Sequence, residues 1–382
     1  MISARTEVPG SGKVDAARVA LVVALVLALH SGFPTPTHVA FFIAIGIVLA
    51  IATRRSVGVA TLLVLLIGGI AIRLAVSDRT GSDVLTVTKV AIDRVLAGLD
   101  PYGYDYKASL PPGAPFPYGP VAILAYMPFH HVAWLLELIS ATAVAVILAL
   151  QGRLVGLAVF VAMPILVSTA TDGSNDTTLG LLIFIAFLVA ARWPMVGGFV
   201  LALATAFKLS ALAFVPGFIA WAGLRVGLVF VLGSVLAWAP VYTTWGVTSF
   251  LLSARQANDI HGDTVTWSFG VLVDGLTRTR QEILEQLKYV AGAVIAVVGL
   301  RYRKTLDGVI LVGIVVYVVT LYGGNWGSYA YLGGIAPLVC WRLDDWLGFE
   351  RLPVMERLRD RFPILATLPS RRWLNRSTSS TS

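Results

Sequence analysis

The chain has 382 residues, of which 57% are hydrophobic and only 13% are charged. A soluble globular domain carries about 25% charged residues, so this composition excludes an ordinary soluble enzyme and indicates a membrane protein. The formal net charge of +8 matches the excess of Lys and Arg in cytoplasmic loops of membrane proteins, and we expect no nucleic-acid partner. The single cysteine, Cys340, excludes a disulfide framework and a cysteine metal site.

Apolar runs of roughly membrane-spanning length recur from one end of the chain to the other. In hydrocarbon the backbone must satisfy its own hydrogen bonds, so these runs predict an all-α polytopic membrane protein with about twelve transmembrane helices. Short basic clusters lie at the ends of the runs, and placing them in the cytoplasm fixes the orientation. The predicted spans are 16–30, 38–53, 57–76, 131–151, 154–171, 177–191, 195–207, 209–222, 226–241, 288–300, 307–322 and 328–342.

This topology predicts a multi-pass protein of the plasma (inner) membrane with both termini in the cytoplasm. Residues 1–343 form a single transmembrane domain, and residues 344–382 form a cytoplasmic tail that begins amphipathic and ends rich in Ser and Thr. The polar segments gather on the outer face, where we therefore expect the chemistry. They are 77–130, 171–176, the turn at Lys208, 242–287 and 323–327.

Asp83 is the first candidate functional residue, just beyond the third predicted span. After it, apolar residues recur at helical spacing, which predicts an amphipathic helix on the outer surface with Thr88, Ala91, Ile92, Val95 and Leu96 on one face. Asp83 stands where a carboxylate caps such a helix. The residues alone favour the cap, but a carboxylate at the membrane boundary is also well suited to act as a general base, so both roles stay open.

A polar, proline-rich loop, "AGLDPYGYDYKASLPPGAPFPYGP", follows this helix at residues 97–120. Asp100 precedes a proline, which ends the helix, while Pro120 can begin a short helix that stops near Pro128. Tyr102 and Tyr118 suit the membrane interface, because they combine an apolar ring with a polar tip. The loop is either an interfacial anchor or a rigid floor for a substrate site.

The segment "TDGSNDTTLG" places Asp172, Asn175 and Asp176 in a tight turn before an apolar run. Asn175 or Asp176 could cap the next helix. The same side chains could bind substrate, and a divalent cation is a further alternative, although no third carboxylate is spaced to complete a metal site. We therefore assign no metal ligands.

Lys208 lies in the apolar stretch "LALATAFKLSALAF". A lysine at mid-membrane costs roughly 2.5–3.5 kcal/mol, so we expect two short helices that meet at Lys208 on the outer face. Its ammonium would suit a lipid phosphate. The alternative is an ion pair with Asp83, Asp172 or Asp176.

The outer segment 242–287 predicts a partly helical lid that carries His261, Asp263, Trp267 and Arg278. Near the last span, the motif "GGNWGSYAYLGG" contains aromatic residues that could stack on a sugar face or mark the membrane interface. The candidates in that motif are Trp326 and Tyr329.

These landmarks resemble the polyprenol-phosphate-mannose-dependent mannosyltransferases of glycosyltransferase family 87, which share the C-type integral-membrane fold. The motifs "AGLDPYGYDY" and "FPYGPVAILAYMPF" carry the resemblance, and "GSNDTTLGLLIFIAFLVAARWP", "LALATAFKLS" and "VTWSFGVLVDGLTR" follow in matching order between Gly69 and Arg342. The chain departs from the family at Val87, where the family has Tyr, in the Asp-Gly-Ser-Asn-Asp turn, and at 325–329, where the family often has His.

The resemblance implies transfer of a sugar, with mannose as the first candidate, from a polyprenyl phosphate to a glycolipid or a cell-envelope glycan, with inversion of configuration. Membrane lipids would surround the protein. The resemblance also implies Asp83 as the general base and Lys208, helped by Arg278, as the group that binds the donor phosphate. Two other classes stay open. A transporter or flippase for lipid-linked sugars would show pseudo-symmetric halves, which the sequence lacks, and a scaffold protein would have lost the catalytic residues.

Overall fold

The computed structural model describes residues 15–32, 35–77, 82–110, 112–259, 267–269, 278–324 and 327–354. Helices make up the secondary structure of these ranges, apart from one isolated antiparallel bridge between Tyr106 and Ala114. The predicted all-α class is therefore confirmed.

Each predicted span corresponds to a helix or to a pair of helices. They are α1 (Ala16–Leu29), α2 (Pro36–Ala52), α3 (Gly58–Val76), α6 (Trp134–Leu150), α7 (Leu154–Ala162), α8 (Pro164–Thr169), α9 (Asp176–Ala190), α10 (Pro194–Phe207), the 3-10 helix η2 (Leu209–Phe214), α11 (Val215–Ala222), α12 (Leu224–Ala237), α15 (Arg278–Gly299), α16 (Leu306–Tyr322) and α17 (Leu332–Trp346). The predicted span 154–171 is broken between α7 and α8, because Pro164 has no N–H to continue the helix.

In the described ranges, two helical segments are long and apolar enough to cross a membrane, Gly58–Val76 and Ile283–Tyr302. A third is formed if Pro120–Phe129 and Trp134–Leu150, bent by 101°, count as one span. The other apolar helices are shorter, so about twelve spans stays a prediction. On α12, leucines spaced four residues apart at 224, 228, 232 and 236 are all exposed, as expected for a face that contacts lipid.

Small residues let the helices of the bundle approach closely. A side chain at Gly180 of α9 would collide with the carbonyl oxygen of Gly333 in α17, and one at Gly156 of α7 would collide with that of Cys340. Such close backbone contacts stabilise helix association in membranes. Helix α17 is thereby held between α7 and α9.

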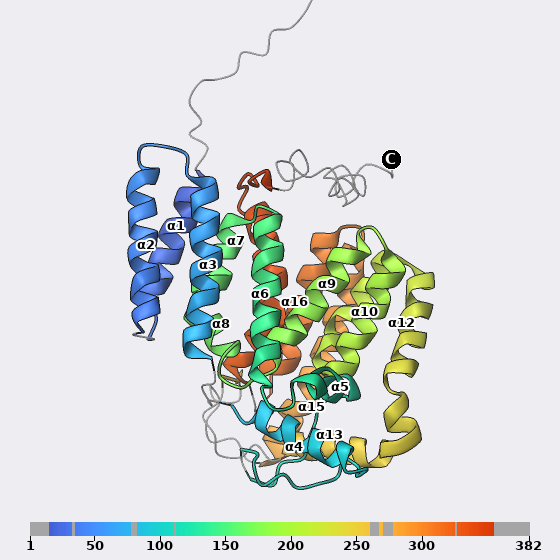
Figure 1. The fold of residues 1–382 in the computed structure, drawn as a ribbon. Helices are drawn as coiled ribbons and strands as arrows, with labels where there is room; N and C mark the ends of the chain where they lie inside the picture. The colour runs from blue at the N-terminus through green and yellow to red at the C-terminus, as the bar shows by residue number, and fades with distance from the viewer. Residues whose placement is uncertain are drawn as a thin grey trace, which may run out of the picture.

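Three helices lie across one end of the bundle, as Figure 1 shows: α4 (Val84–Leu96), α5 (Pro120–Tyr126) and α13 (Val247–Asp259). This is the end at which α3 stops and the loop of residues 97–119 returns. The segment that follows α17 lies at the opposite end. In the predicted topology, the crossing helices face the outside.

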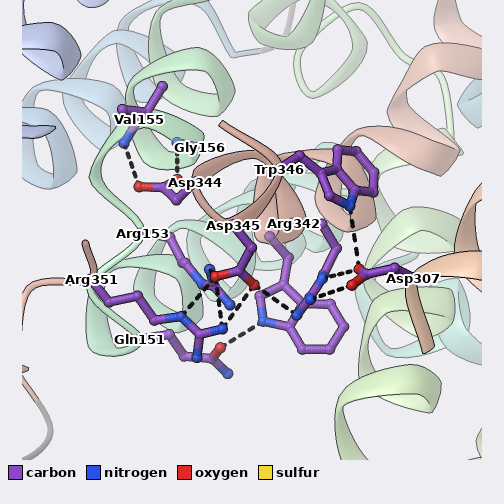
Figure 2. A network of polar contacts seen from close by, with 11 residues as sticks. Gln151, Arg153, Val155, Gly156, Asp307, Arg342, Asp344, Asp345, Trp346 and Arg351 are labelled. Carbon is purple, nitrogen blue, oxygen red and sulfur yellow. Dashed lines mark hydrogen bonds and ion pairs between the residues drawn. The ribbon is translucent and has the colours of Figure 1, made fainter. Parts of the chain in front are cut away.

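The opposite end is held by the network of charges in Figure 2. Asp345 pairs with Arg153, whose side chain is fully buried, and with Arg342 (2.9 Å) and Arg351 (2.8 Å). Arg342 also donates to Asp307 (2.6 Å) at the start of α16. The network joins the α6–α7 turn, α16 and α17.

The segment that the sequence assigned to a tail from Asp344 begins inside α17. The Asp344 carboxylate is buried and accepts hydrogen bonds from the backbone N–H groups of Val155 (3.2 Å) and Gly156 (2.8 Å), so it caps α7. The Leu352 N–H donates to the carbonyl oxygen of Gly152 (3.1 Å), which fastens residues 347–354 to the same turn. Residues 355–382 lie outside the described ranges.

Candidate functional site

Asp83 occupies the N-cap position of α4, but its side chain makes no capping hydrogen bond. Instead, its Oδ2 atom accepts a hydrogen bond from the backbone N–H of Leu110 (2.6 Å), in the returning loop. Of the two alternatives for Asp83, the one in which its side chain caps the helix is therefore wrong. Burial raises the pKa of Asp83 above its usual 3.8, although the Leu110 hydrogen bond opposes this shift. A carboxylate with a raised pKa binds a proton more readily, as a general base must.

The surface helix that begins after Asp83 is amphipathic, as predicted. Thr88, Ala91 and Ile92 are buried, whereas Leu96 in the last turn is 63% exposed. Leu96, the last residue of the helix, therefore departs from the predicted buried face. Beside it, Arg94 donates to the carbonyl oxygen of Asp100 (2.9 Å).

The polar turn 171–176 lies directly against the segment that carries Asp83. The backbone N–H of Ser82 donates to the carbonyl oxygen of Asp172 (2.7 Å), and that of Leu85 donates to the carbonyl oxygen of Gly173 (2.9 Å). Gly173 has φ +91°, and a Cβ there would lie 2.8 Å from the carbonyl oxygen of Ser82. Only glycine fits this conformation and this close approach without strain.

Asp172 uses both carboxylate oxygens to hold its surroundings. Its Oδ1 accepts a hydrogen bond from the Ser174 N–H (2.9 Å), and its Oδ2 accepts one from the Tyr329 hydroxyl (2.7 Å). Burial raises the pKa of Asp172 above its usual value, while these hydrogen bonds act in the opposite direction. The hydrogen bond between the Tyr329 hydroxyl and Asp172 places Tyr329 beside the turn 171–176.

Lys208 lies at the predicted break, where α10 ends and the backbone is extended (φ −151°) before η2. Its Nζ donates to Asp176 Oδ1 (2.7 Å) and Asn175 Oδ1 (3.1 Å). The ion-pair alternative is therefore what the structure contains, with Asp176 as the partner. The rings of Tyr118 and Tyr331 lie 5.3 and 5.0 Å from Nζ, within the range of a cation–π interaction.

Asn175 and Asp176 do not cap α9 with their side chains as the sequence suggested. Asn175 holds the N-cap position without a capping hydrogen bond, and Asp176 is the first residue of the helix. Both side chains are buried, and the Asn175 Nδ2 atom lacks a hydrogen-bond partner among the described residues.

Two candidate residues in the proline-rich loop, Asp100 and Tyr102, make hydrogen bonds within the loop. Asp100 Oδ1 accepts a hydrogen bond from the Tyr102 N–H (2.8 Å), and the buried Tyr102 donates its hydroxyl to the carbonyl oxygen of Tyr118 (3.0 Å). The Tyr102 ring packs edge-on against Phe250 of α13 at 5.1 Å. These residues make the loop rigid.

The same loop is joined to the residues beside Lys208. The Gly119 N–H donates to the carbonyl oxygen of Phe207 (3.2 Å), and a side chain at position 119 would collide with the Ala206 carbonyl. Burial raises the pKa of Tyr118 well above its usual value, and Tyr331, Asp176 and Asp83 add to the shift. Tyr118 therefore lies close enough to both Asp83 and Asp176 for their charges to raise its pKa.

The remaining candidates lie partly outside the described ranges. His261, Asp263 and Trp326 fall outside them, and Arg278 is the first residue of α15, of whose side chain nothing is described. Trp267 donates its backbone N–H to Gly327 (2.8 Å), and its ring lies 6.1 Å from that of Tyr329.

Glu137, a buried carboxylate in the first turn of α6, was not predicted from the sequence. It accepts hydrogen bonds from the hydroxyls of Tyr126 and Thr178 and from the Thr178 N–H (3.2 Å). Glu137 thus caps α9 from a neighbouring helix and joins it to α5. A carboxylate in an apolar run was the available signal.

Arg73, buried in α3, was missed as well. Its guanidinium donates to the carbonyl oxygens of Phe160 (2.7 Å), Val161 (3.2 Å) and Leu166 (3.4 Å). The break before Pro164 frees carbonyls from helical pairing, and a buried carbonyl without a donor is costly. Arg73 therefore stabilises the α7–α8 break and fixes it to α3.

In the described part of the chain, no three His, Cys, Asp or Glu side chains are grouped so as to hold a metal ion. No protein-family model, curated protein or solved structure matches the chain.

Proposed function

We propose that the chain is a glycosyltransferase that moves a sugar, with mannose as the first candidate, from a polyprenyl phosphate to a polar acceptor at the outer membrane face. One observation carries the proposal: the turn 171–176 contacts both the segment of Asp83 and the ammonium of Lys208. The segment that carries a carboxylate suited to accept a proton, and a cation suited to bind a phosphate, thereby both contact one turn.

In the proposed reaction, the acceptor hydroxyl attacks the anomeric carbon and transfers its proton to Asp83. The bond between the anomeric carbon and the phosphate oxygen breaks, and the configuration inverts because the attack comes from the opposite side. The leaving phosphate is stable as an anion and needs no proton. Lys208 stabilises the negative charge that develops on it.

The described parts of the loop, residues 97–110 and 112–120, support the proposal that one carboxylate and one cation suffice. Asp83 and Lys208 each contact this loop, through Leu110 and Tyr118 respectively. Groups fixed before substrate arrives need no reorganisation in the transition state, which is the main source of electrostatic catalysis. Two apolar helices long enough to cross a membrane fit a substrate that is itself a lipid.

The test reconstitutes the purified chain in liposomes with polyprenyl phosphate that carries radiolabelled mannose, and with a glycolipid acceptor extract. A second reaction contains a labelled nucleotide sugar in place of the lipid donor. We expect labelled glycolipid with the lipid donor alone. Transfer from the nucleotide sugar, or movement of the intact lipid donor across the bilayer without transfer, would contradict the proposal; the latter result is the one a flippase gives.

A further inference from the structure

We infer that Asp172 is a positioning residue, which holds the backbone on both sides of Asp83 through the turn 172–174. The inference rests on the proposed function, in which Asp83 takes the acceptor proton. It assigns Asp172 a role distinct from contact with substrate and from that of a second base.

The turn reaches Asp83 through the backbone. The backbone N–H groups of Ser82 and Leu85, on either side of residue 83, donate to the backbone carbonyl oxygens of Asp172 (2.7 Å) and Gly173 (2.9 Å). The backbone at residue 83 cannot move away from the turn without lengthening one of these two hydrogen bonds. Its own hydrogen bond from Leu110 (2.6 Å) then fixes the carboxylate along a third direction.

The carboxylate of Asp172 determines the shape of the turn. Its Oδ1 accepts from the Ser174 N–H (2.9 Å), an interaction two residues along the chain that stabilises a tight turn around Gly173. Its Oδ2 accepts from the Tyr329 hydroxyl (2.7 Å), in the 3-10 helix η5 (Tyr329–Tyr331) that begins the last helix pair. The turn is therefore anchored to a second part of the bundle.

The occupied oxygens also argue against Asp172 as the base. Burial raises the pKa of Asp172 as it does that of Asp83, but Asp172 is only 6% exposed and both of its carboxylate oxygens already accept hydrogen bonds, which leaves less room for an acceptor hydroxyl. Helix α8, which precedes the turn, is fixed as well, because Arg73 donates to the carbonyl oxygen of Leu166 (3.4 Å). The turn is thus anchored by Tyr329 and follows a fixed helix, and the backbone at Asp83 is hydrogen-bonded to it on either side.

The experiment compares wild type with Asp172→Ala, Asp172→Asn and Tyr329→Phe. The matched control is Asp105→Asn, which changes an exposed carboxylate in the loop of residues 97–120. The first measurement is hydrogen–deuterium exchange of the peptide that contains residues 82–88 in the purified full-length protein. Asp172→Ala and Tyr329→Phe should raise exchange there at least threefold, whereas the control should leave it unchanged. Unchanged exchange in both variants would overturn the inference.

The second measurement is transfer as a function of pH. A positioning role predicts that Asp172→Ala lowers kcat by 10-fold or more with an unchanged KM for the lipid donor. It also predicts that the acid limb moves to lower pH, because the Asp83 carboxyl becomes more exposed to water. Asp172→Asn, which retains an oxygen for the Ser174 N–H, should recover part of the rate.

The outcomes separate this inference from the proposed function. An Asp172→Asn variant as inactive as Asp83→Asn would identify Asp172 as a base and overturn the positioning role. A kcat loss with an unmoved acid limb and unchanged exchange would reduce Asp172 to a residue of general stability. If wild type transfers no sugar, the proposed function fails, and the exchange measurement still decides whether Asp172 holds the segment of Asp83.

Discussion

The ion pair between Lys208 and Asp176 makes a sharp prediction about stability. The side chains are 12% and 2% exposed, so water screens the pair little. Removal of one partner leaves the other charge buried and uncompensated, which costs about 3–5 kcal/mol. Coulomb's law gives about 6 kcal/mol for two unit charges 2.7 Å apart at an effective dielectric constant of about 20, which is the same order of magnitude.

The perturbation is Lys208→Met, Asp176→Asn and the double variant. Lys208→Met should lose most, because Asp176 then has no cation beside it. Asp176→Asn should lose less, since Asn175 and the rings of Tyr118 and Tyr331 remain around the ammonium. The double variant should recover about 1–3 kcal/mol of the summed losses, the coupling expected of residues in contact.

The assay is a double-mutant cycle of unfolding free energies, measured by denaturant titration in mixed micelles. Losses below about 1 kcal/mol for both single variants, without coupling, would place the pair among solvent-screened surface ion pairs and refute the reasoning. Arg18 and Asp15, a more exposed pair in α1 and its cap, provide the matched control, and the same cycle there should give less than about 1 kcal/mol.

Three further predictions follow from other contacts. Asp83 has a raised pKa in the folded chain, so its ionisation costs stability as the pH rises through that pKa. Asp83→Asn should therefore have a higher melting temperature than wild type at neutral pH. This difference should vanish in acid, where the carboxyl of the wild type is protonated. Gly119→Ala should cost about 1–3 kcal/mol in a denaturant titration, because its Cβ meets the Ala206 carbonyl. Arg153 holds the pKa of Asp345 below its usual 3.8, although burial opposes this shift. The protein should therefore lose stability as the pH falls below 3.8 and Asp345 becomes protonated. Asp345→Asn should abolish this loss in thermal melts across the acid range.

The sequence predicted the elements of the site better than their contacts. The break at Lys208 could be predicted, because a lysine inside a continuous apolar helix is too costly. The short helix after Pro120 and the surface helix after Asp83 followed from proline geometry and helical periodicity. These signals are local, and they placed the helices to within a few residues.

The contacts depend on residues far apart in the chain, and periodicity does not report them. The backbone hydrogen bonds from Ser82 and Leu85 to the turn at Asp172 are an example, because backbone groups carry no sequence signal. Arg73 and Glu137 were missed for a related reason. Their partners are backbone carbonyls and hydroxyls of other helices, which only the folded chain brings together.

The central claim is that Asp83 is the base in transfer from a lipid-linked sugar. The most direct test measures initial transfer rates from polyprenyl-phosphate mannose for wild type, Asp83→Asn and the control Asp105→Asn, at matched amounts of folded protein. We expect a loss of 100-fold or more for Asp83→Asn, the contribution typical of a general base, and a rate for the control equal to that of wild type. A rate for Asp83→Asn equal to that of wild type would contradict the claim.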